Sequence, residues 1–119
     1  MIGVVRAAAF VAAVSISAGA YAAGAIAIDD EVGQHHDEVG YGVAVGEHSR
    51  DEAAGAAMKR CRKEGNANCR VVVRFDKCGA YATSQTHFGV GWGNSQRAAQ
   101  TMALNECGSN CRVAVSECE

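Results

Sequence analysis

Hydrophobic and polar positions follow the same order twice along this chain. In each copy a short run of small apolar residues leads to a glycine-rich apolar run, an alanine-rich stretch and a valine run. The periodicity of the apolar residues and the turn-forming residues between the runs predict strand, strand, helix and strand for each copy. The first copy is expected at about 24–28, 41–46, 50–61 and 69–75, and the second at about 79–83, 87–93, 96–107 and 111–117.

The two helices have recognisable starts and a narrow apolar face. Ser49 with Glu52 three residues later forms a capping box, and Ser95 takes the same position in the second copy. Small apolar residues recur at helical spacing and are expected to face a sheet closely. They are Ala53, Ala57, Met58 and Cys61 in the first helix, and Ala99, Ala103, Leu104 and Cys107 in the second.

The last strand of the first copy alternates along its length. A period of two puts Val71, Val73 and Phe75 on one face, with Val72 and Arg74 on the other. We therefore expect the first three residues to pack together.

The six cysteines occupy matched places in the two copies, which indicates a disulfide framework in an exported chain. Cys61 and Cys69 each flank a helix–strand turn, as do Cys107 and Cys111, so each pair is expected to bridge. Cys78 and Cys118 remain, and they meet if their strands are antiparallel neighbours. A zinc site at Cys107 and Cys111 is the less favoured alternative, because export leads to an oxidising space.

The first 22 residues have the features of an export signal. One positive charge precedes a short alanine-rich apolar run, and small residues allow cleavage after Ala22 or Ala20. The run is too short and too rich in alanine to predict a membrane anchor. We expect a signal peptide at 1–22 and one secreted domain at 23–119, with repeats at about 24–76 and 78–119.

Charge is distributed unevenly along the expected mature chain. Residues 29–52 hold eight acids and one base, whereas residues 53–77 hold seven bases and two acids. The basic cluster Lys59, Arg60, Arg62 and Lys63 is a possible partner surface, although two solvated segments that attract each other are the simpler interpretation. The cluster lacks interleaved aromatic residues, so nucleic acid is not expected as a partner.

Trp92 stands where the first copy has Val45. A large apolar side chain at this position is either a core residue, which we favour, or an exposed anchor for a partner. Trp92 therefore joins the four basic residues as a possible partner-surface residue.

Candidate catalytic and ligand-binding residues are few. His35 and His36 lie among acids and are weak metal-ligand candidates, but neighbouring side chains on an extended chain point apart. The glycine-rich runs do not match a dinucleotide fingerprint, and no Gly-x-Ser-x-Gly elbow is present. We expect no catalytic residues, no metal and no cofactor.

Several segments, taken in order and spacing, resemble a family of small exported actinobacterial proteins classed as a domain of unknown function. The resemblance covers nearly all of the mature chain. It is carried by Gly24-Ala25-Ile26-Ala27, Cys61, Cys69-Arg70-Val71-Val72, Phe75, Cys78-Gly79-Ala80, Arg97-Ala98-Ala99 and Cys118. The long acidic loop and the pair Cys107 and Cys111 depart from the pattern. The resemblance implies an exported compartment and this fold, and no activity.

These patterns together predict an α+β domain of two tandem strand-strand-helix-strand units, with an antiparallel or mixed sheet, two helices and three disulfides. The expected function is that of a secreted, non-enzymatic binding module at a host or cell-envelope surface. An inhibitor of a secreted enzyme, such as a protease, is the alternative.

Overall fold

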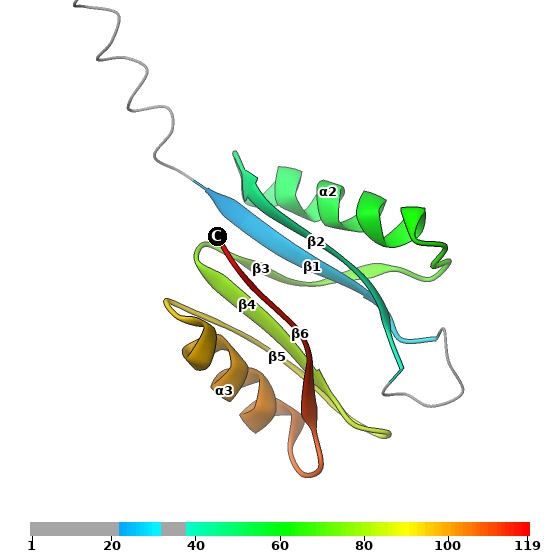
Figure 1. Cartoon of the computed structure of the whole chain (residues 1–119), viewed down its shortest axis with the longest axis vertical. Helices are drawn as coiled ribbons and strands as arrows, with labels where there is room; N and C mark the ends of the chain where they lie inside the picture. The colour runs from blue at the N-terminus through cyan, green and yellow to red at the C-terminus, as the bar shows by residue number, and fades with distance from the viewer. Residues whose placement is uncertain (1–21, 32–37) are drawn as a thin grey trace, which may run out of the picture.

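A computed structural model describes residues 22–31 and 38–119 (Figure 1). The expected signal peptide therefore lies outside the described residues except for Ala22, and His35 and His36 lie outside them as well. Among the described helices, none is long and apolar enough to cross a membrane.

The structure has the two tandem strand-strand-helix-strand units that the sequence predicts. The first unit comprises β1 (Ala23–Asp29), β2 (Gly40–Glu47), α2 (Arg50–Lys63) and β3 (Arg70–Phe75). The second comprises β4 (Cys78–Thr83), β5 (Phe88–Gly93), α3 (Gln96–Cys107) and β6 (Arg112–Cys118). The α+β class is thereby confirmed.

Each unit forms its own sheet, and every strand pairing is antiparallel. The strand orders are β2-β1-β3 and β5-β4-β6, so the first strand of each unit is central. Both edges of each central strand are filled from within its own unit, and no strand pairs across the two units. The sheets instead pack face to face between the two helices, giving helix, sheet, sheet and helix layers (Figure 1).

The two units are related by an approximate two-fold rotation. Strand β1 lies against β4, β2 against β6, and β3 against β5. Strand β2 of the first unit corresponds to β5 of the second, and β3 corresponds to β6. The β2–β6 contact and the β5–β3 contact are therefore symmetry equivalents, as expected for an interface between two copies of the same surface. The sequence repeat is thus also a repeat in space.

Each helix begins as expected and lies very close to its sheet. The Ser49 Oγ accepts from the Glu52 amide at 3.0 Å, and the Ser95 Oγ accepts from the Ala98 amide at 3.1 Å. The helix–sheet contacts consist almost wholly of alanine and cystine. A Cβ atom on Gly42 would overlap the backbone of α2, so glycine there is a requirement of the close approach.

The larger apolar side chains lie between the two sheets. This core contains Ile26, Ile28, Val73, Phe75, Tyr81 and Val115. The Phe75 ring occupies the space that Cβ atoms on Gly24 and Gly79 would need, so one ring fills the centre of the sandwich. The two-fold counterpart of Phe75 is Glu117, which is exposed, because the centre has room for only one ring.

The expected alternation in β3 is wrong for Val71. A β-bulge shifts the pairing between Ile26 and Ala27. Val71 therefore packs on the helix side of the sheet, while Val72 joins Val73 and Phe75 at the core between the sheets. A bulge changes which face a side chain takes, and period-two patterning cannot anticipate it.

All six cysteines are paired as expected from their positions. Cys61–Cys69 and Cys107–Cys111 each join a helix end to the following strand, with Cα atoms 6.2 Å apart in both cases. Cys78–Cys118 joins directly opposed residues of β4 and β6, with Cα atoms 4.0 Å apart. The last bridge therefore closes the whole second unit.

Among the buried residues of the cluster between the sheets, Tyr81 is the one that carries a polar group. Its hydroxyl is buried without a hydrogen-bond partner among the described residues. Burial raises the pKa of Tyr81 above its ordinary value of 10.0, and the Asp30 carboxylate raises it further, against smaller opposing effects of Thr83 and Arg70. The neutral phenol is therefore the form that the fold favours.

The disulfides should differ in their contribution to stability because they close loops of different length. The chain-entropy relation gives about 4 kcal/mol for the separation of 40 residues at Cys78–Cys118, about 2.5 for 8 at Cys61–Cys69, and about 2 for 4 at Cys107–Cys111. Urea unfolding of the three paired Cys→Ala variants should show this order. A variant lacking Cys107 and Cys111 that is the least stable of the three would contradict it.

The same Gly→Ala change should have opposite effects at two positions. Gly42→Ala forces a methyl group into the α2 backbone and should cost about 1–3 kcal/mol. Gly55 lies inside α2 with open space around it, so Gly55→Ala should stabilise by about 0.5–1 kcal/mol. Thermal unfolding of the two oxidised variants measures both. Equal effects at the two sites would mean that α2 does not lie as close to β2 as described.

Tyr81 should make the protein lose stability at alkaline pH. Because its folded pKa is raised, the unfolded chain releases the proton first, and the stability present below pH 10.0 decreases as the pH rises through the folded value. Tyr81→Phe should remove this loss while keeping neutral-pH stability within about 1 kcal/mol, because the hydroxyl it deletes has no partner. Tyr41→Phe, at an exposed position, is the matched control and should unfold with alkali as the native chain does.

Candidate functional site

The structure separates Trp92 from the basic cluster Lys59, Arg60, Arg62 and Lys63. The four basic side chains are exposed on the C-terminal part of α2, where the Arg60 Nη1 donates to the Val43 carbonyl at 2.7 Å. Trp92 lies on β5 and lines a groove with Arg50, at the N-terminal end of α2. Ten helical residues separate Arg50 from Arg60, which is about 15 Å along the axis. The two parts therefore do not form one continuous surface.

Trp92 is 53% exposed, so the expectation that it fills the core is wrong. The sheets overlap with β3 resting on both β4 and β5, which leaves the outer side of β5 uncovered. A residue whose side chain points towards the other sheet can therefore still reach solvent at this edge.

The apolar side chains of β5 all point the same way. Gly89, Gly91 and Gly93 face α3, and Cβ atoms there would meet that helix. The alternate residues Phe88, Val90 and Trp92 consequently face the other sheet. Val90 is half-buried, while Phe88 is 49% exposed.

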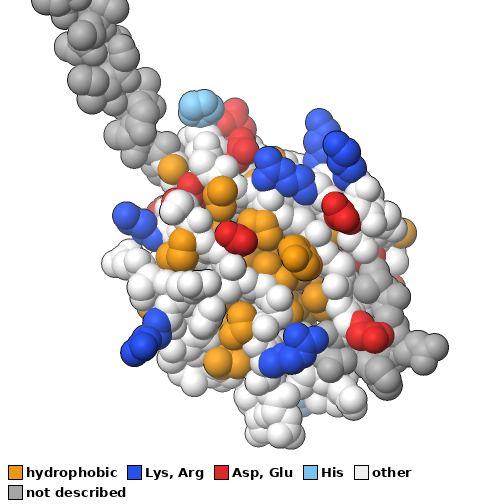
Figure 2. Space-filling model, in the orientation of Figure 1, with side chains coloured by type: hydrophobic (Ala, Val, Ile, Leu, Met, Phe, Trp, Pro, Cys, Tyr) orange, Lys and Arg blue, Asp and Glu red, His pale blue; other side chains and the backbone are white. Residues whose placement is uncertain are grey.

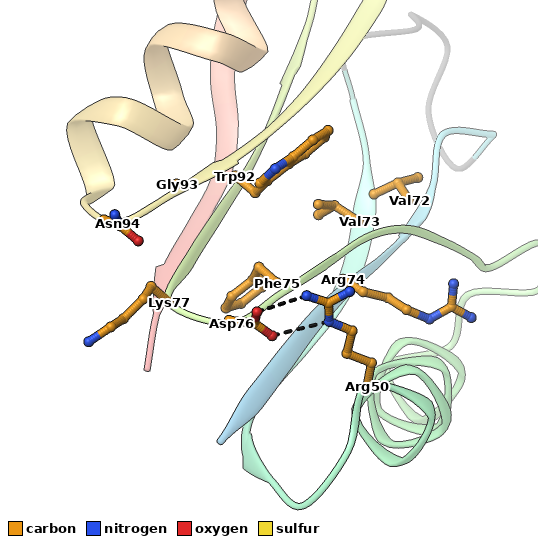
Figure 3. A pocket seen from close by; sticks show the side chains of 10 residues that line it. All are labelled: Arg50, Val72, Val73, Arg74, Phe75, Asp76, Lys77, Trp92, Gly93 and Asn94. Atoms are coloured by element: carbon orange, nitrogen blue, oxygen red, sulfur yellow. Dashed lines mark hydrogen bonds and ion pairs between the residues drawn. The ribbon is translucent and has the colours of Figure 1, made fainter. Parts of the chain in front are cut away.

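The bulge in β3 adds a fourth apolar residue to this edge. Val72, shifted onto the core side of its sheet, lies beside Trp92 in the same groove (Figure 3). We call the set Val72, Phe88, Val90 and Trp92 the β5 rim.

The groove at the Trp92 end of the rim has a volume of about 420 Å³. Figure 3 shows the indole ring directed towards Val72 and Val73, with Phe75 beneath it. Two hydrogen bonds, of 2.8 Å and 3.1 Å, join the Arg50 guanidinium to both oxygens of Asp76 at the groove wall. This bidentate pair joins the start of α2 to the β3–β4 turn at the wall of the groove.

Two contacts hold Phe88 at its end of the rim. The Phe88 ring stacks on Tyr81 with centroids 5.8 Å apart, and the Arg70 Cζ lies over the Phe88 ring, 5.2 Å from its centroid. Arg70 also pairs with Asp30 at 3.0 Å. Phe88 is thus exposed yet fixed, which lowers the entropy that a partner must remove on binding.

The first unit places an equivalent set on β2. Tyr41, Val43 and Val45 take the positions of Phe88, Val90 and Trp92, and Tyr41 is 50% exposed. Hydrophobic side chains thus reach the surface outside the core, and Figure 2 shows them gathered across the middle of one face, with charged side chains around them.

The backbone edges of β2 and β5 differ. On β2 the Val43 carbonyl accepts from Arg60, and the Gly46 amide donates to the Glu119 Oε1 at 2.6 Å. Among the described residues, no group from another element makes a hydrogen bond to the outer edge of β5. The β5 edge is therefore open where its counterpart is capped.

In the described part of the chain, the serines and cysteines singled out in the sequence have structural roles. Ser49 and Ser95 are helix caps, and every cysteine is in a disulfide. No three His, Cys, Asp or Glu side chains of the described residues gather as metal ligands would.

Sequence reasoning singled out Trp92 but missed Phe88, Val90 and Val72. The alternation Phe88-Gly89-Val90-Gly91-Trp92-Gly93 contained the signal for two of them, because in a strand it puts every large side chain on one face. Nothing in the sequence indicates the bulge that brings in Val72.

Comparison with known proteins identifies a family for this chain. No curated protein and no solved structure matches it. The family DUF4189, described as a domain of unknown function, matches residues 23–118, which include both units and all three disulfides. The chain therefore belongs to the DUF4189 family.

Proposed function

We propose that this protein is an exported, non-enzymatic binding module, and that the β5 rim is the surface that contacts its partner. The observation that carries the proposal is the exposure of two aromatic side chains, Phe88 and Trp92, on one uncharged edge strand. Large aromatic side chains at a partly formed groove are the residues that dominate binding energy at protein interfaces.

The surroundings of the rim favour a protein partner. Apolar residues at the centre are flanked by charged pairs, Arg50–Asp76 at one end and Arg70–Asp30 at the other. An apolar centre with a polar border is the usual composition of a protein–protein interface. Three disulfides and the Tyr81–Phe88 stack keep the surface in one shape, so little order has to be gained on association.

Export supports the same proposal from the sequence. The signal-like segment 1–22 and the six paired cysteines are typical of a chain that matures in an oxidising space. The alternative, an inhibitor of a secreted enzyme, would use a rigid protruding loop, and the candidate loop lies largely in residues 32–37, outside the described residues.

Trp92→Ala should abolish partner capture without unfolding the protein. Truncating a central aromatic residue typically costs about 2 kcal/mol or more of binding energy, roughly 30-fold in affinity. Its half-exposed position predicts little change in the unfolding midpoint. The measurement is capture of secreted and envelope proteins of the source organism on immobilised mature protein, followed by the affinity of whatever the native chain retains.

The repeat supplies the control for this experiment. Val45→Ala changes the equivalent position on β2, where the edge is capped, and should retain the partner. A partner retained equally by Trp92→Ala and the native chain would show that the β5 rim is not the binding surface.

A further inference from the structure

The geometry points to a second copy of this chain as the occupant of the β5 edge, so that two β5 strands pair antiparallel across a two-fold axis at Val90. This inference rests on the proposed function of the β5 rim and names its partner. The result would be a continuous six-stranded sheet, β6-β4-β5-β5-β4-β6, with the two rims meeting on one face.

Among the four edge strands, β5 alone lacks the features that usually prevent edge pairing. Strand β3 contains a bulge and two arginines, and β6 contains a bulge, Arg112 and Glu117. The β1–β2 ladder is irregular between Ala23 and Ala25, and the outer edge of β2 is capped. The β4–β5 ladder is regular throughout, and β5 carries no charge and no proline.

The free hydrogen-bonding groups of β5 lie on the same residues as the rim. The Ser84 amide donates to the His87 carbonyl at 2.9 Å, which marks the first hydrogen-bonded pair of the β4–β5 hairpin. Such pairs alternate in an antiparallel ladder, so Gly89, Gly91 and Gly93 bond to β4. The amides and carbonyls of Phe88, Val90 and Trp92 consequently point outwards and can be satisfied by a further strand.

The sequence of β5 is nearly palindromic, which suits pairing with itself. In Phe88-Gly89-Val90-Gly91-Trp92, rotation about Val90 puts valine opposite valine, glycine opposite glycine and Phe88 opposite Trp92 of the second copy. Aromatic pairs directly opposed on neighbouring strands stabilise a sheet. The four aromatic rings would extend the core between the sheets, to which Val72 and Val90 already contribute.

Helix α3 offers a complementary surface on the other face of the sheet. Beside β5 it carries a depression of about 680 Å³, lined by Ser95, Arg97, Ala98, Thr101, Met102, Asn105 and Glu106. The positions on α2 equivalent to Ala98, Thr101 and Met102 are Glu52, Gly55 and Ala56. At the Ala98 position the second unit thus lacks the charge that Glu52 gives the first unit.

Charges at the two ends of this flank match across the proposed axis. Glu106 lies over Gly89, and Arg97 is next to Ala98, which lies over Gly93. Antiparallel pairing brings Arg97 of one copy to the end where Glu106 of the other copy lies. Both side chains are exposed, and neither has an ion pair among the described residues.

Charge reversal tests this arrangement in the mature, oxidised full chain. Analytical ultracentrifugation from low micromolar to high micromolar concentration should show a monomer–dimer equilibrium for the native protein. The proposed dimer contains two symmetry-related pairs of Arg97 with Glu106 of the other copy. Glu106→Arg or Arg97→Glu places like charges in both pairs, so each variant should weaken the dimer by roughly tenfold or more. The double variant restores opposite charges across the axis and should return the dissociation constant to within about threefold of the native value.

A second measurement follows the rim itself. Trp92 is the chain's single tryptophan, so its emission should shift to shorter wavelength as the dimer forms, and Phe88→Ala should abolish both the shift and the dimer. Lys59→Glu on α2 is the matched control and should dimerise as the native chain does.

The outcomes separate this inference from the proposed function. A native chain that stays monomeric at every concentration overturns the dimer, and so does a dimer that Glu106→Arg and Phe88→Ala both leave unchanged. Capture of another protein that still depends on Trp92 would then leave the binding function standing with a different partner. A monomer that also captures nothing through Trp92 would overturn both.

Discussion

The close approach of each helix to its sheet is the constraint on which the rest of this structure depends. Because α2 and α3 lie almost on the strand backbones, the fully covered positions between each helix and its sheet are occupied by alanine, glycine and cystine. The helix side of each sheet therefore buries little apolar area per residue, and apolar area removed from water is the main favourable term in folding. The large, fully buried side chains lie on the opposite face of each sheet, where the two sheets meet.

That distribution explains both the stability and the exposed surface. A domain of this size buries only a modest core, and three disulfides supplement it by restricting the unfolded chain. The same requirement for glycine beneath α3 puts Phe88, Val90 and Trp92 together on one face of β5. The sandwich is too narrow to cover this outer strand, so a consequence of helix packing becomes an aromatic rim.

The two units differ at the centre of the sandwich and at the outer edges of β2 and β5. Only one ring fits at the centre, so Phe75 fills it while its counterpart Glu117 reaches solvent. At the edges, Arg60 and Glu119 satisfy backbone groups of β2, and no equivalent side chain does so for β5 among the described residues. One unit therefore ends in a protected edge and the other in an edge able to pair.

Much of the secondary structure of this protein could be predicted from its sequence, because the pattern of each helix and strand occurs twice, once in each copy of the repeat. The matched periodicity located all eight helices and strands of the described residues to within a few positions, and Ser49 and Ser95 marked both helix starts. The cysteines could be paired because each lies at the end of an element whose neighbours the repeat made evident. These are local properties, set by spacing along the chain.

The tertiary structure alone decided the features that depend on how the sheets are placed. Two separate sheets, the β3 bulge that turns Val71 and Val72 to opposite faces, and the exposure of Trp92 all follow from contacts between distant segments. Hydrophobic patterning states which face a side chain takes, but whether that face is covered depends on the width and offset of the opposing layer. For this reason the sequence could identify Trp92 as notable, whereas only the packed sandwich showed that it lies at an open edge beside Val72 and Phe88.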